Sequence, residues 1–138
     1  LEEALENSSQ ARQRNVDYDT FEKIDQLKMG VRWLQKYRSD WNLDTYAFFS
    51  IRDFYGKLPF ENGGIVDLYR NYFGAGSRLT YSKTLKNISH QWQLGMEAAS
   101  QSDQRDRFLN QNGIQGTSVF SQQERFDSFG LYVLDELK

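Results

Sequence analysis

The chain has 138 residues, with 17 basic and 19 acidic side chains and a formal net charge of −2. This near-neutral balance lacks the basic footprint of nucleic-acid-binding proteins, so no nucleic-acid partner is expected. The absence of cysteine excludes disulfides, thiolate metal sites and cysteine nucleophiles.

Length and composition predict one folded domain, with 38% hydrophobic and 15% aromatic residues. Residues 1–16 are polar and predict an N-terminal segment or linker helix, and residues 17–138 a single helical domain. The first residue is leucine, which favours a domain excised from a larger protein and leaves its compartment unknown. Apolar runs are only a few residues long, so no membrane insertion of this segment is expected.

The first strong helical pattern covers about 18–38. Its apolar residues recur at spacings of three, four and three on one helical face. They are Phe21, Ile24, Leu27, Val31 and Leu34. We therefore expect a helix here.

Residues 41–73 form the densest aromatic stretch, with ten of the chain's 21 aromatic residues. Asp44 is a candidate N-cap for a helix through Tyr55, because Gly56 and Pro59 would end it. A second helix is expected from about 64 to 73, with Gly74 and Gly76 ending it. Aromatic side chains bury large areas, so this stretch is expected in a core, an interface or a ligand groove.

Three further helices are expected at about 78–100, 102–110 and 121–137, the last from a capping box of Ser121 and Glu124. Residues 78–84 and 131–134 also fit short strands, which remains the alternative there. The predicted fold class is all-α, an irregular bundle of about six helices with an aromatic-rich core.

A partner-binding surface is predicted where tyrosine and arginine lie close together in the sequence. Exposed tyrosine with arginine is typical of protein interfaces, although core packing of the tyrosines is the competing interpretation. The predicted residues are Arg52, Tyr55, Tyr69, Arg70 and Tyr72. The expected partner is another protein or a second copy of this chain.

Catalytic signals are weak. Asp53 is a candidate acid, because aromatic neighbours could desolvate it and stack a sugar ring, whereas a salt bridge is the simpler reading. The only histidine, His90, is expected to project to solvent without a role. No cofactor motif or metal site is expected.

The favoured function is therefore a non-catalytic helical protein-interaction module. A small carboxylate-dependent glycan hydrolase and a small-ligand sensory domain are the alternatives.

Overall fold

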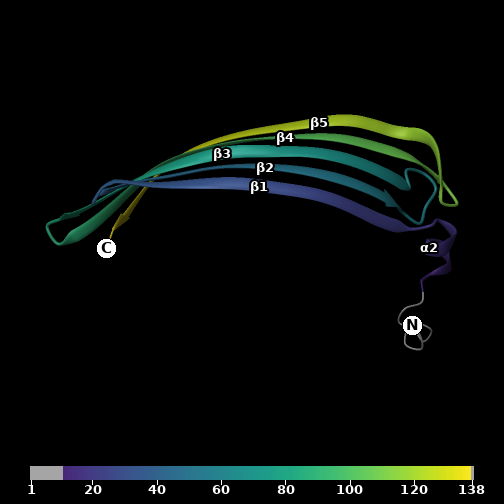
Figure 1. Ribbon diagram of the computed structural model, residues 1–138, viewed down its shortest axis with the longest axis horizontal. Coiled ribbons are helices and arrows are strands. Elements are labelled where there is room, and N and C mark those ends of the chain that lie inside the picture. Colours follow the sequence, from purple (N-terminus) through teal and green to yellow (C-terminus); the bar gives the residue numbers. More distant parts are fainter. Residues whose placement is uncertain (1–10, 138) are drawn as a thin grey trace, which may run out of the picture. The chain divides into compact units, whose positions relative to one another are not determined.

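The computed structural model describes residues 11–137, which are almost entirely β-structure. The short helix α2 (Gln13–Asp17) precedes five strands. The strands are β1 (Phe21–Arg38), β2 (Trp41–Lys57), β3 (Ile65–Leu85), β4 (Ile88–Gln111) and β5 (Ile114–Leu137). They form one antiparallel sheet in which each strand pairs with the next in sequence, as Figure 1 shows.

The predicted all-α bundle is therefore wrong, and so is the predicted helical protein-interaction module, because the described residues are almost entirely β-structure. In residues 18–38 the spacing of three and four was incidental, because Leu27, Met29, Val31 and Trp33 also recur at every second position. Successive side chains of a strand point to opposite faces, so this period of two places all four on one face of β1. The helices expected at about 44–55, 64–73, 78–100, 102–110 and 121–137 are likewise strand segments.

Glycines were also misread as helix ends. Gly74 and Gly76 lie inside β3, and both are buried. The alternative strands at 78–84 and 131–134 fall within the much longer β3 and β5.

Tight turns join several neighbouring strands. Lys86 and Asn87 between β3 and β4 have φ of 47° and 70°, and Asn112 and Gly113 between β4 and β5 have φ of 49° and 88°. Positive φ at both central residues is the mark of the hairpin turns whose twist matches that of the strands. The β2–β3 connection, residues 58–64, contains the chain's only proline.

The chain divides into two compact units, and each strand contributes to both. Unit 1 comprises Leu1–Asp25, Arg52–Tyr69 and Asp103–Glu124, and unit 2 comprises Gln26–Ile51, Arg70–Ser102 and Arg125–Lys138. Residues 1–16 were predicted to form either a polar N-terminal segment or a linker helix. Residues 1–10 of this segment lie outside the described residues, and α2, which begins at Gln13, covers the end of the segment.

The predicted aromatic-rich core does not form. Among residues 11–137, Ile65 is the only buried hydrophobic side chain, whereas thirty large hydrophobic side chains are exposed. A single sheet layer explains this, because no other element of the described residues covers either face. In the same residues no helix is long and apolar enough to cross a membrane.

Asn110 organises the polar centre of unit 1 and is fully buried. Its side-chain Nδ2 donates hydrogen bonds to the carbonyls of Tyr18 (3.1 Å) and Leu58 (3.0 Å), and its Oδ1 accepts one from the backbone N–H of Gly113 (2.7 Å). Its own backbone N–H donates to the Glu61 carbonyl at 2.8 Å. One side chain thereby ties the β2–β3 connection and the β4–β5 turn together.

Candidate functional site

Unit 2 presents one strongly apolar face. Alternate residues of all five strands point to it, and Thr45 on β2 lies against Ser77 on β3 within it. Beyond the band named below, on the same side of the sheet, Ser100 on β4 donates to Asp127 on β5. We call its central band the apolar face. It consists of Leu27, Met29, Val31, Trp33, Leu43, Thr45, Ala47, Phe49, Ile51, Phe73, Ala75, Ser77, Leu79, Leu94, Met96, Ala98, Phe129, Leu131 and Val133.

These side chains are exposed to an unusual degree. Val133 is 77% exposed, Phe129 70% and Val31 67%. Large contiguous apolar patches are rare on the surfaces of soluble monomers, and they mark sites where another apolar phase or molecule lies. The apolar face as named contains no charged residue; charged positions of the same alternation lie beyond it on β5, with Arg125 and Asp127 at one end and Asp135 at the other.

An aromatic row borders the apolar face at the end near the Lys86–Asn87 turn. Trp41 stacks on Tyr81 with ring centroids 4.4 Å apart, Tyr81 on Trp92 at 5.5 Å, and Trp92 on His90 at 4.9 Å. His90 Nδ1 also lies 3.3 Å from the Asp135 carboxylate on β5. The predicted role-free, solvent-directed histidine is thus part of a stack that crosses three strands.

The opposite face of unit 2 is polar, and we call it the polar face. Its side chains come from the other alternate positions. They are Lys28, Gly30, Arg32, Leu34, Lys36, Asn42, Asp44, Tyr46, Phe48, Ser50, Arg70, Tyr72, Gly74, Gly76, Arg78, Thr80, Ser82, Gln91, Gln93, Gly95, Glu97, Ala99, Gln101, Phe126, Ser128, Gly130, Tyr132, Leu134 and Glu136.

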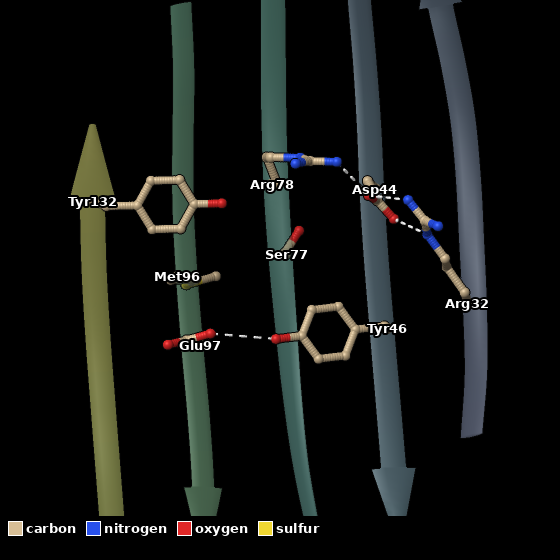
Figure 2. A pocket seen from close by; sticks show the side chains of 8 residues that line it. All are labelled: Arg32, Asp44, Tyr46, Ser77, Arg78, Met96, Glu97 and Tyr132. Atoms are coloured by element: carbon tan, nitrogen blue, oxygen red, sulfur yellow. Dashed lines mark hydrogen bonds and ion pairs between the residues drawn. The ribbon is translucent and has the colours of Figure 1, made fainter. Parts of the chain in front are cut away.

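Asp44 lies at the centre of the polar face between two arginines. Arg32 donates to both carboxylate oxygens, with Nε at 2.8 Å and Nη2 at 2.7 Å, and Arg78 Nη2 donates at 2.8 Å. Figure 2 shows the two guanidinium groups approaching Asp44 from β1 and β3. The hydrogen bond from Arg32, reinforced by Arg78, lowers the pKa of the Asp44 carboxyl below its ordinary value.

Three aromatic rings on this face cover glycines of the next strand. Phe48 lies on Gly74, Tyr46 on Gly76 and Tyr132 on Gly95. A Cβ at Gly76 would lie 2.6 Å from Cζ of Tyr46, and one at Gly74 would lie 2.6 Å from Cζ of Phe48, so any side chain would displace the ring.

Tyr46 also links two strands further apart, as its hydroxyl donates to Glu97 on β4 at 3.4 Å (Figure 2). Burial, with the nearby Glu97 charge, raises the pKa of the Tyr46 hydroxyl. Together with Arg32, Asp44, Arg78 and Tyr132, these two residues line a depression of about 330 Å³.

Asp53, the predicted catalytic candidate, lies in unit 1 beside Lys23, Asp25, Tyr55 and Asp67, which together line a second depression of about 330 Å³. Burial raises the pKa of the Asp67 carboxyl, and the charges of Asp53 and Asp106 add to the effect. Within residues 11–137 no cluster of three or more histidine or acidic residues is arranged to hold a metal ion.

The predicted partner-binding residues are divided between the two units. Arg52, Tyr55 and Tyr69 belong to unit 1, and Arg70 and Tyr72 to unit 2. Within unit 1, Arg52 packs its guanidinium 5.9 Å from the Phe54 ring centroid, whereas Tyr55 points to the other face and donates to Gln115 at 3.2 Å. Tyr72 contacts Phe48 with ring centroids 5.0 Å apart on the polar face.

The apolar face, the aromatic row and the Asp44 arginine pair were missed from sequence. The signal that could have found the apolar face is the alternation of apolar and polar residues in segments such as 27–33 and 129–133. The chain matches no protein-family model and no curated protein.

Proposed function

We propose that unit 2 is a membrane-embedded β-sheet whose apolar face packs against lipid hydrocarbon and whose polar face is in contact with water. This departs from the expectation of no membrane insertion, which rested on the length of apolar runs and so considered only continuous apolar spans. The observation that carries this proposal is the charge-free apolar face, built from alternate residues of all five strands and left uncovered in residues 11–137. An uncovered face of this kind is unfavourable in water and favourable in hydrocarbon, because burial of apolar area stabilises by about 25 cal/mol per Å².

Strand length supports the proposal. The segments of the five strands within unit 2 are 11 to 16 residues long. A tilted strand needs about 9–11 residues to cross the hydrocarbon core of a bilayer. Each segment therefore covers that thickness.

The aromatic row supports it as well. Tryptophan and tyrosine concentrate at membrane–water interfaces, where the ring meets acyl chains and the polar atom meets water. Trp41, Tyr81 and Trp92 form a row beside the uncharged apolar face, and the contact of His90 with the Asp135 carboxylate lies at the same end. The aromatic row thus marks this end of the hydrocarbon-facing band, and charged groups begin beyond it.

The two hydroxyls within the band are paired with each other. Thr45 and Ser77 are the only hydroxyl-bearing residues of the apolar face, and their hydroxyls hydrogen-bond to each other at 3.0 Å. A polar group in hydrocarbon costs several kcal/mol when it has no partner, on the order given by transfer measurements. In the bilayer the outer edges of β1 and β5 then pair with further strands, because their backbone groups need partners too.

Vesicle flotation tests the proposal. The refolded chain is mixed with phosphatidylcholine vesicles and centrifuged through a density gradient, and we expect it to float with the lipid. Leu131→Lys places a charge in the apolar face and should make folding into lipid less favourable by about 3 kcal/mol. Gln93→Lys places the same charge on the polar face and should float as the unmodified chain does. Equal flotation of both variants, or no flotation of the unmodified chain, would overturn the proposal.

A further inference from the structure

We infer that the polar face of unit 2 holds a binding site for a small soluble anion bearing carboxylate or phosphate groups. The site is a depression of about 290 Å³ beside the Asp44 arginine pair, lined among others by Arg32, Lys36, Asp44, Arg78 and Thr80. This inference rests on the proposed function only in requiring that the polar face meets water.

The charge of the depression is unbalanced. Three of its lining side chains are cationic and only Asp44 is anionic, which leaves a net charge of +2. Arg32 and Arg78 share the single carboxylate of Asp44, so together they retain one uncompensated positive charge. Lys36 supplies the other, because it has no ion-pair partner among residues 11–137.

The donors are accessible and held in place. The Arg32 and Arg78 side chains are 60% and 44% exposed even while bonded to Asp44. A guanidinium carries five N–H donors, of which Arg32 uses two and Arg78 one on Asp44, so several remain for a ligand. Asp44 thus occupies donors of both arginines and neutralises one of their two charges, and Figure 2 shows their side chains converging on it.

The shape favours a compact ligand. Asn42 and Thr80 add neutral donors at the wall of the depression, whose volume suits an anion of a few to about ten heavy atoms rather than a polymer. Planar guanidinium groups pair best with carboxylate or phosphate oxygens, which match their fork of N–H donors. Pyrophosphate and citrate present these two chemistries at similar size.

The inference is tested by isothermal titration calorimetry of the full chain in maltoside micelles, with pyrophosphate and citrate in separate experiments. We expect saturable binding of at least one anion that weakens as salt rises. Lys36→Gln and Arg78→Gln should each weaken binding about tenfold, the loss expected for one hydrogen bond to a charged group. Arg125→Gln, which removes the same charge from the other face of the sheet, should leave affinity unchanged.

The Asp44→Asn variant distinguishes an anion-binding site from an ion network with a purely structural role. Loss of the carboxylate releases donors of both arginines, so anion affinity should rise several-fold, whereas an exclusively structural network predicts no such gain. No saturable binding, an equal loss in Arg125→Gln, or weaker binding in Asp44→Asn would overturn the inference. Each variant is also floated with vesicles, and a chain that floats without binding anions overturns the anion site alone.

Discussion

The side-chain oxygens of Thr45 and Ser77 lie 3.0 Å apart across β2 and β3, in the middle of a face that otherwise consists of apolar side chains. Two hydroxyls that satisfy each other cost little in an apolar surrounding, whereas one hydroxyl alone lacks a partner. The stability that this pair contributes therefore depends on whether water or an apolar phase covers the apolar face.

A double-mutant cycle on Thr45 and Ser77 tests that relationship. Thr45→Val and Ser77→Ala should each lower the free energy of unfolding by about 1 kcal/mol in lipid vesicles, because each leaves an unpaired hydroxyl. The double variant should lose less than the two single losses together. Urea titration of the four proteins supplies the energies, and strict additivity would show that the hydroxyls do not interact.

The ring-covered glycines of the polar face predict a second effect. Gly76→Ala would place a methyl group against the Tyr46 ring, and overpacking of this kind costs about 1–3 kcal/mol. The loss should shrink when Tyr46 is changed to Ser in the same chain, because the ring no longer occupies the space. Gly30→Ala is the control, since its nearest neighbour would lie 3.5 Å from the new Cβ, an ordinary contact.

Asp44 predicts a dependence of stability on pH. Its pKa in the folded chain lies below that in the unfolded chain, because Arg32 and Arg78 stabilise the carboxylate. This contribution is fully present above the unfolded-state pKa and is lost as pH falls through the folded-state pKa. Urea midpoints from pH 7 down to pH 3 should therefore fall more steeply for the unmodified chain than for Asp44→Asn. Parallel curves would contradict the prediction.

Asp67 should behave in the opposite sense. Burial and the neighbouring charges of Asp53 and Asp106 raise its pKa in the folded chain, so its ionised form opposes folding above that pKa. Asp67→Asn should consequently stabilise the chain at pH 7, and the gain should shrink as pH falls through the folded-state pKa and vanish below the unfolded-state pKa. Asp25→Asn, in the exposed pair with Lys23, is the matched control and should show no such gain.

Asn110 is expected to be the most sensitive polar residue of unit 1. Asn110→Ala leaves the Tyr18 and Leu58 carbonyls and the Gly113 N–H without this partner, and we expect a loss of about 3 kcal/mol. Denaturant unfolding measures the loss. Asn112→Ala, at the adjacent turn, places alanine at a position with positive φ and should lower the free energy of unfolding by only about 1 kcal/mol.

The sequence contained more of this fold than helical periodicity revealed. Asn112–Gly113 is a strong hairpin signal, and the alternation from Leu27 to Trp33 is a strand pattern. The strand pattern was set aside because Phe21, Ile24, Leu27, Val31 and Leu34 also fit a helix. When apolar residues are frequent, the same positions can fit both the helical period and the strand period. Only the length of the segment and the residues of the flanking turns then distinguish a helix from a strand.

The Asp44 site could not be found in this way. Arg32, Asp44 and Arg78 come from three strands, and their meeting depends on the register of two strand pairs. Glycines that looked like helix ends, such as Gly76, instead make room for rings from the neighbouring strand. Sequence spacing carries no information on either relationship until the pairing of strands is known.

The most direct test of the central proposal is nitroxide labelling of single cysteines, which the cysteine-free chain permits without background. Labels at Val31, Leu94 and Leu131 on the apolar face are compared with labels at Gln93 and Ser128 on the polar face, in phosphatidylcholine vesicles. We expect apolar-face labels to collide with dissolved oxygen and to avoid a water-soluble nickel complex, and polar-face labels to show the reverse. Equal collision with the nickel complex on both faces would contradict a lipid-covered apolar face.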